Sequence, residues 1–186
     1  NQMARIQEAD RLEIIDDHVT HWQEADIING SAISIIIGFA VAQLIALRAA
    51  YVAITQLLDS DLPTLRAERD AIWGISPNDD DGVWFRFTQY KTMVRARLGA
   101  KHPLSRTVPN LGETTVERYL VIMQQFIDHW ERVNAALPSP LTLGAFTLAD
   151  LQTAMIHMDT KLKAIENAET TLAIRREERD QFLGDE

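Results

Sequence analysis

The stretch ISIIIGFAVAQLIAL, residues 33–47, decides the fold because it carries no charged side chain. The uncharged run around it extends from Ile27 to Leu47, between Asp26 and Arg48. As a helix, a run of this length would span about 30 Å, the thickness of a bilayer core. Such a segment can cross a membrane, fill a protein core or bind a partner. The rest of the chain has to decide among these three uses.

The composition is typical of a globular protein. The chain has 186 residues, 46% of them hydrophobic and 24% charged, which is enough for one domain with a buried core. It contains no cysteine, and this excludes disulfides, thiol nucleophiles and zinc–thiolate sites. The net charge of −9 disfavours nucleic acid and anionic membranes as partners, because polyphosphates are bound mainly through Lys and Arg. We therefore expect neither partner.

One segment departs from this acidic balance. Between Asp81 and Glu113 the chain has basic residues but no acidic ones. They are Arg86, Lys91, Arg95, Arg97, Lys101 and Arg106. We interpret them as a solvated helix face that pairs with acidic neighbours in the same bundle.

Apolar residues recur at helical spacing almost throughout, and strand-like alternation is absent, so we predict an all-α fold. The Asn29-Gly30 turn and Ser31 should begin the second helix, which Pro63 should bend or restart. The predicted helices cover 3–25, 31–74, 80–98, 114–137 and 147–184. Residues 101–112, with two prolines, form the expected linker.

Each predicted helix has an apolar stripe that should face the core. In the second helix the stripe residues are spaced alternately three and four, as in a helix packed lengthwise against another. The stripes are Leu12, Ile15, Val19 and Trp22; Ile33, Ile37, Ala40, Leu44, Leu47, Tyr51, Ile54 and Leu58; Trp84, Phe87, Met93 or Val94, and Leu98; Val116, Leu120, Met123, Ile127, Trp130 and Leu137; and Leu148, Leu151, Met155, Met158, Leu162, Ile165 and Leu172.

The two halves of the chain share sequence markers. His21-Trp22 and His129-Trp130 fall late in the first and fourth predicted helices. Glu-Arg-Asp at 68–70 and again at 178–180 falls near the ends of the second and fifth. We predict two duplicated helical hairpins, 3–74 and 113–184, joined by a linking helix and loop over 75–112. Packed together they would form an antiparallel four-helix bundle in a single domain, 1–186.

The predicted second helix is also apolar on the side opposite its stripe, where a helix of a bundle should carry polar side chains exposed to solvent. Either the third helix covers this side through Trp84 and Phe87, or another protein does. Further apolar residues lie off the stripes of the fourth and fifth helices. The candidate partner-binding residues are Ile35, Phe39, Ala42, Ala46, Val121, Ile122 and Ile156. Core packing of these same residues is the competing interpretation.

The sequence gives little support for catalysis or a metal centre. No histidine has Glu three residues before it, as helical di-iron sites require. His18 and His21 share a helix face but lack identifiable further ligands. The acidic run at 78–82 fails the EF-hand template, and no nucleophile elbow or phosphate-binding loop is present. We expect a non-enzyme with no catalytic residue, no metal site and no cofactor.

A transmembrane helix is disfavoured by the polar residues within the run and by Asp150, His157 and Asp159 in the corresponding part of the second hairpin. Our first hypothesis is a soluble helical bundle whose apolar helix face binds a protein partner or a second copy. An engineered interface on a natural bundle would give the same excess of apolar residues outside the stripes. The alternative is a bundle that binds a small apolar ligand or a metal between its helices. A membrane-associated protein is the third hypothesis.

Overall fold

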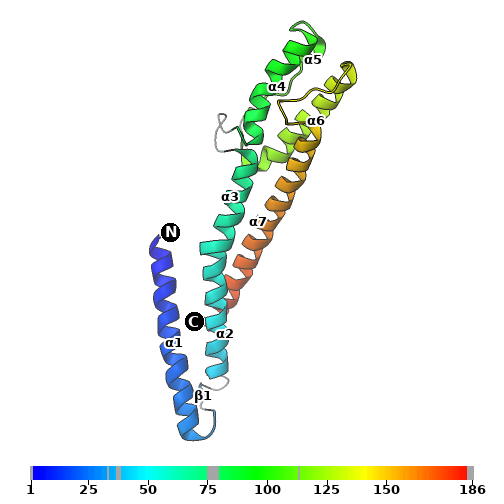
Figure 1. Ribbon diagram of the computed structural model, residues 1–186. Coiled ribbons are helices and arrows are strands. Elements are labelled where there is room, and N and C mark those ends of the chain that lie inside the picture. Colours follow the sequence, from blue (N-terminus) through cyan, green and yellow to red (C-terminus); the bar gives the residue numbers. More distant parts are fainter. Residues whose placement is uncertain (1, 33, 37–38, 75–79, 113, 184–186) are drawn as a thin grey trace. The chain divides into compact units, whose positions relative to one another are not determined.

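The computed structural model describes the backbone of residues 2–32, 34–36, 39–74, 80–112 and 114–183, and the side chains of 12–32, 40–74, 80–112 and 114–181. The chain is predominantly helical, which confirms the all-α prediction (Figure 1). The helices are α1 (Gln2–Asn29), α2 (Val41–Gln56), η1 (Leu57–Asp61), α3 (Leu62–Trp73), α4 (Val83–Leu98), α5 (Pro103–Arg106), η2 (Val116–Arg118), α6 (Tyr119–Ala136) and α7 (Leu148–Leu183). Two short strands, β1 (Ser34–Ile36) and β2 (Phe39–Ala40), precede α2.

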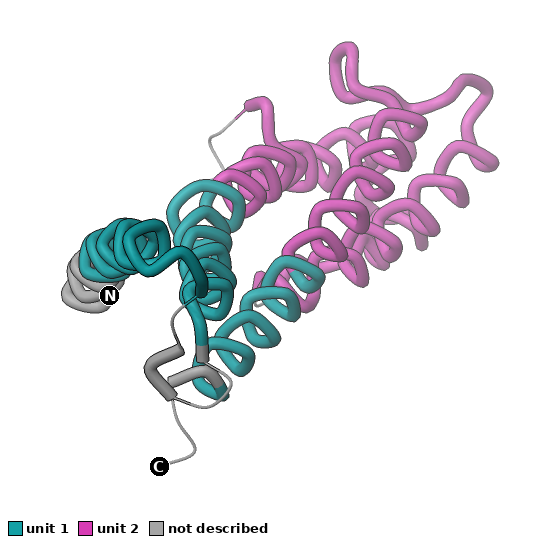
Figure 2. The backbone as a smooth tube through the Cα atoms, turned by 90° about the horizontal axis from the view of Figure 1, so that it is seen from below, with its two compact units in different colours: residues 1–63, 166–186 teal, residues 64–165 magenta. Residues whose placement is uncertain are grey.

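The chain divides into two compact units (Figure 2). Unit 1 comprises residues 1–63 and 166–186, and unit 2 comprises residues 64–165. The divisions fall inside α3 and α7, so each of these helices contributes to both units. They do not coincide with the ends of the predicted hairpins. A single four-helix bundle of duplicated hairpins is thus not established by the fold.

In unit 1, α1 packs against α2. Their shared core is formed by Ile15, Leu47 and Tyr51, with Leu12, Val19 and Leu44 packed around it. These residues belong to the predicted stripes, because side chains three and four positions apart fall on one helix face. The C-terminal part of α7 belongs to the same unit, where Leu172 is buried and the Arg179 guanidinium lies 5.8 Å from the centre of the Tyr51 ring.

The predicted start of the second helix at Ser31 is wrong. Residues 34–36 pair with 39–40 as an antiparallel hairpin, with Ser34 opposite Ala40 and Ile36 opposite Phe39. The sequence contains four isoleucines between 33 and 37, and β-branched side chains favour strands over helices. The helix begins only at Val41, where the Gln43 side chain accepts the Ala40 N–H at 2.8 Å. The predicted stripe residues Ile33 and Ile37 lie outside the described residues.

Pro63 was predicted to bend the second helix or to restart it at Ser60 or Asp61. The helix instead continues from Val41 to Trp73 and passes through a π-helical turn, η1, before α3 begins. Proline has no N–H to give to the carbonyl four residues earlier, so a local change in hydrogen bonding is expected beside it. At η1 the Leu62 N–H bonds to the Leu57 carbonyl, five residues back. Gly74, with φ of 96°, then ends α3 as predicted.

Unit 2 has a core rich in aromatic residues. Phe87 of α4 stacks on Phe126 of α6, with ring centres 3.8 Å apart, and Trp73 of α3 stacks on Tyr119 at 4.0 Å. Leu151 and Met158 of α7 complete this core as predicted. Large flat side chains bury much apolar area, so they dominate the packing of a small unit.

The end of α6 and the start of α7 lie where the sequence predicts them. Pro138 and Pro140 follow the end of α6, as expected of residues that stop a helix. Thr147 and Asp150 form a reciprocal cap at the start of α7: the Thr147 N–H bonds to the Asp150 carboxylate at 2.7 Å, and the Asp150 N–H bonds to Thr147 Oγ1 at 3.3 Å. The Trp130 indole N–H bonds to the Leu141 carbonyl at 3.1 Å and holds the connecting loop against α6.

Candidate functional site

The exposed side of α2 is apolar from Ala42 to Val52. We name this surface the α2 face and define it as Ala42, Ile45, Ala46, Ala49 and Val52, all of which are exposed. Ile45 and Val52 each keep 42% of their surface accessible. The opposite side of the same helix is buried through Leu47, Ala50, Tyr51 and Ile54. A surface helix normally has a polar outer side, so the α2 face requires a separate explanation.

The edge of the α2 face is defined by an ion pair. Arg48 of α2 donates hydrogen bonds to the Asp16 carboxylate of α1, and this contact holds the pKa of Asp16 below its usual value. Both side chains remain 46% exposed, so the pair contributes little to stability. Arg48, the one charged residue of α2, is therefore turned toward α1 and away from the apolar side.

A shallow groove of about 460 Å³ borders the α2 face within unit 1. The α2 side of this groove is formed by Ala46, Ala49, Ala50 and Ala53, and the α7 side by Arg175 and Glu178. Arg175 and Glu178 pair with each other at 2.8 Å. Alanines at these spacings leave a flat strip that another helix can approach closely.

The sequence offered the predicted third helix as one candidate to cover this face. That helix is α4, and its Phe87 and Trp84 pack in the core of unit 2 against α6 and its neighbours. The α2 face belongs to unit 1.

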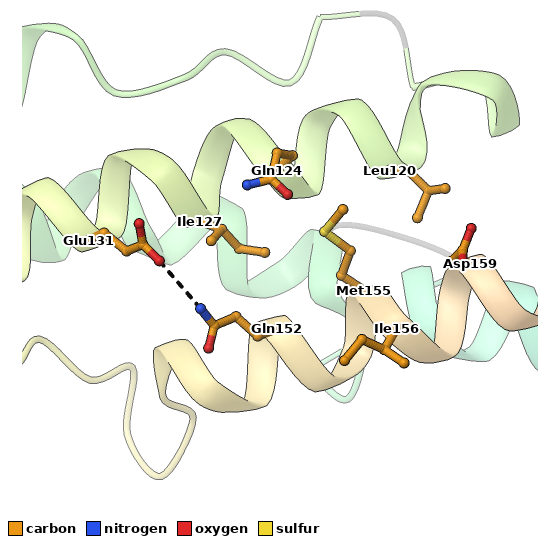
Figure 3. A pocket seen from close by; sticks show the side chains of 8 residues that line it. All are labelled: Leu120, Gln124, Ile127, Glu131, Gln152, Met155, Ile156 and Asp159. Atoms are coloured by element: carbon orange, nitrogen blue, oxygen red, sulfur yellow. Dashed lines mark hydrogen bonds between the residues drawn. The ribbon is translucent and has the colours of Figure 1, made fainter.

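A second apolar surface lies between α6 and α7 in unit 2. It is a groove of about 420 Å³, which we name the α6–α7 groove. Apolar and polar side chains alternate around it (Figure 3). The lining residues are Leu120, Gln124, Ile127 and Glu131 of α6 and Gln152, Met155, Ile156 and Asp159 of α7.

The predicted partner-binding residues have different positions in the structure. Ala42 and Ala46 belong to the α2 face, and Ile156, 65% exposed, lines the α6–α7 groove. Val121 is 52% exposed but does not line that groove. The prediction for Ile122 is wrong, because its side chain is fully buried in the core of unit 2. The reason is that α6 is covered over a wider angle than its predicted stripe.

The other two predicted residues, Ile35 and Phe39, lie in β1 and β2 rather than on a helix. Helical spacing therefore does not connect them with Ala42 and Ala46, as we had expected. Their side chains lie outside the described residues.

A buried polar network was not anticipated from the sequence. His129 Nδ1 lies 2.9 Å from the Tyr90 hydroxyl, and His129 Nε2 lies 2.9 Å from the Leu104 carbonyl. The carbonyl can only accept, so Nε2 donates to it and Nδ1 accepts from the Tyr90 O–H. Burial lowers the pKa of His129 and raises that of Tyr90, which keeps both groups neutral. The helical position of His129, three residues after Phe126, could have indicated that its side chain is buried, but not which groups it bonds to.

Within the described parts of the chain, no three His, Asp or Glu side chains come together as a metal site would require. His18 and His21 are both exposed, and His18 Nδ1 contacts the Ile14 carbonyl of its own helix at 2.8 Å. The acidic run at 78–82, which fails the EF-hand template, includes residues 78 and 79, and these lie outside the described residues. By length and composition, the continuous helical segment Val41–Trp73 could cross a membrane.

Comparisons with protein families, curated proteins and solved structures found no match to this chain. Its function therefore has to be inferred from its own residues. Those residues offer two apolar surfaces, the α2 face and the α6–α7 groove, which differ in charge and shape. The α2 face is flat and uncharged, whereas the α6–α7 groove is concave and has carboxylates on its rim.

Proposed function

We propose that this chain is a non-catalytic helical protein that associates with a second copy of itself through the α2 face. The observation that carries the proposal is the exposure of Ile45, Ala49 and Val52 opposite a side of α2 that is already buried against α1. Two helices that present small and aliphatic side chains can pack with their axes close together.

A second copy suits this surface better than a different protein does, because of charge. In a two-fold contact each patch meets itself, so any charge on the patch meets its own like. The chain has a net charge of −9, which works against most ways of joining two copies. The five residues of the α2 face carry no charge and can meet their own copies without repulsion.

The expected affinity is low. Fully burying an aliphatic side chain contributes about 1.5 to 3 kcal/mol, so covering the 42% of Ile45 or Val52 that is exposed contributes about 0.6 to 1.3 kcal/mol each. Four such side chains in a two-fold dimer contribute about 2.5 to 5 kcal/mol, with the alanines in addition. Association costs at least about 4 kcal/mol, so the dimer should form only at high protein concentration.

The experiment is sedimentation velocity over a wide concentration range, with the variants Ala49→Glu and Ala67→Glu. Ala49 is central to the α2 face, whereas Ala67 is an exposed alanine of α3 and serves as a matched control. We expect the wild type and Ala67→Glu to dimerise and Ala49→Glu to remain monomeric with unchanged circular dichroism. A wild type that is monomeric throughout, or a dimer that tolerates Ala49→Glu, would refute the proposal.

A membrane-associated helix is the second candidate, and the apolar length of Val41–Trp73 favours it. Two features argue for the protein contact, because charged side chains are costly within a membrane. Arg48 is paired with Asp16, and the π-helical turn contains Asp59 and Asp61. Flotation with neutral phosphatidylcholine vesicles separates the two. If the wild type floats with the vesicles and Ala49→Glu does not, the α2 face binds membranes, and the proposal of self-association is wrong.

We also infer that the two predicted hairpins, 3–74 and 113–184, arose by duplication of one ancestral hairpin. In both, the Arg of Glu-Arg-Asp pairs with the next residue: Arg69 with Asp70 at 2.7 Å and Arg179 with Asp180 at 2.8 Å. Both arginine side chains are 15% exposed. An experimental structure in which the backbones of 41–73 and 148–181 fail to superimpose with these pairs aligned would contradict the duplication.

A further inference from the structure

We propose that the α6–α7 groove binds a short amphipathic helix with aliphatic side chains on one face and Lys or Arg on its flanks. This site belongs to unit 2 and is independent of the proposed self-association through α2. The argument uses the exposure of its floor, its length and the charge of its rim.

The floor of the groove consists of apolar side chains, and some of them are exposed to solvent. On α7, Leu151 and Met158 are buried in the core, whereas Ile156 is 65% exposed and Met155 is half-buried. On α6, Ile127 reaches the groove from its edge of the core. An aliphatic side chain as exposed as Ile156 gains most from a partner that covers it. Methionine adapts its shape to different partners.

The length of the groove matches a helix of two to three turns. The lining residues of α6 run from Leu120 to Glu131, which at 1.5 Å per residue is roughly 16 Å. Those of α7 follow the spacing of one helix face from Gln152 to Asp159, which is roughly 10 Å. Figure 3 shows Ile127 and Met155 between the two helices, with Glu131 and Gln152 at one end and Leu120 and Asp159 at the other. An aliphatic stripe laid into such a groove is a common mode of helix recognition.

The rim of the groove is acidic. None of its eight lining residues is basic, and Glu131 and Asp159 are placed toward opposite ends. Glu131 accepts a hydrogen bond from Gln152 at 3.4 Å, and Asp159 pairs with Lys163 at 2.6 Å. A ligand with basic flanks complements this rim, and an anionic membrane does not.

The basic helix of this chain, α4, is not the occupant when it comes from a second copy. Its apolar side chains Phe87, Tyr90 and Val94 are buried in the core of unit 2. Its exposed residues include Lys91 and Arg95 and provide no aliphatic stripe for the groove. The occupant is therefore a different polypeptide that has both features on one helix.

The test uses fluorescence anisotropy with a labelled synthetic helix that carries Leu at i, i+3, i+4 and i+7 and Lys on both flanks. A peptide with Glu in place of every Lys is the charge control. We expect the Lys peptide to bind the full-length protein and the Glu peptide to bind at least about tenfold more weakly. In Glu131→Lys, the preference between the two peptides should decrease.

The protein variants are Ile156→Lys and its matched control Ile174→Lys. Both isoleucines are exposed residues of α7, at 65% and 51%, but Ile174 lies outside the groove. We expect Ile156→Lys to weaken Lys-peptide binding by about tenfold or more and Ile174→Lys to leave it unchanged, with both variants fully helical. The variant Ala49→Glu should bind the peptide like the wild type, which keeps this test separate from self-association.

Three results would overturn the proposal. The first is no binding of the Lys peptide at any concentration, and the second is equal loss of binding in both isoleucine variants. The third is binding of an uncharged fluorescent probe to the wild type that disappears in Ile156→Lys and that the Lys peptide does not displace. This last result would make the groove a site for a small apolar ligand.

Discussion

Replacement by alanine should have very different effects on stability at the neighbouring positions 121 and 122 of α6. Ile122 is fully buried, and Val121 is 52% exposed. Replacing a buried isoleucine with alanine removes its transfer free energy and leaves a cavity, which together cost about 2 to 5 kcal/mol. Because Ile122 has no exposed surface and packs in an aromatic-rich core, we expect Ile122→Ala to lower the free energy of unfolding by about 3 to 4 kcal/mol.

Val121→Ala should have almost no effect on stability. It removes two methyl groups, worth about 1.6 kcal/mol if fully buried, but about half of this is never gained at an exposed position. Alanine also forms helix better than valine by roughly 0.6 kcal/mol, which offsets most of the remainder. The expected net change is below about 0.5 kcal/mol.

The assay is urea unfolding followed by circular dichroism at 222 nm, a wavelength that reports helix content. Thermal unfolding gives a second reading: the midpoint of Ile122→Ala should fall by roughly 6 to 16 °C at this chain length. If Ile122 instead faced a partner, Ile122→Ala would reduce association and leave the monomer stable. Equal effects at the two positions would refute our assignment of Ile122 to the core.

Two further predictions concern groups that hold the helix ends and the buried network. Burial lowers the pKa of His129, so as pH falls through about 6.5 the unfolded chain takes up a proton that the folded chain refuses. Stability should therefore be complete above that pH and decline below it, and His129→Gln should lack this part of the decline when urea midpoints are compared across pH. Thr147→Ala removes the cap at the start of α7 and should cost about 1 kcal/mol in urea unfolding. Thr153→Ala, at an exposed position inside the same helix, is its control and should change stability by less than about 0.5 kcal/mol; equal losses would mean that the cap contributes nothing.

Most helices were predictable because their signals are local. The stripes around Ile15, Tyr51 and Trp130 follow from helical spacing, and the cap at Thr147 follows from the distance to Asp150. The strands at 34–36 and 39–40 were missed because we gave more weight to the helical spacing of the apolar residues than to their β-branched side chains. Packing across the chain was beyond such reasoning.

The remaining features were not predicted from the sequence because they depend on contacts between residues far apart in the chain. Ile122 is buried because neighbouring helices cover α6 over a wide angle, and no periodicity reports how wide that angle is. The bond between Tyr90 and His129 joins residues 39 positions apart, so neither residue signals it locally. Exposure of the α2 face could be proposed from the sequence, since both sides of that helix are apolar. The α6–α7 groove could not, because it depends on how two helices diverge.

The division of the chain has a consequence for how the protein is made. Unit 2 is one continuous segment, 64–165, whereas unit 1 needs residues from before and after that segment. During synthesis the ribosome releases everything that unit 2 requires before the last turns of α7 exist. The α1–α2 pair must wait, with its apolar side chains uncovered by α7, until residues 166–181 emerge. This interval is when the growing chain is most exposed to aggregation and to premature pairing with another nascent copy.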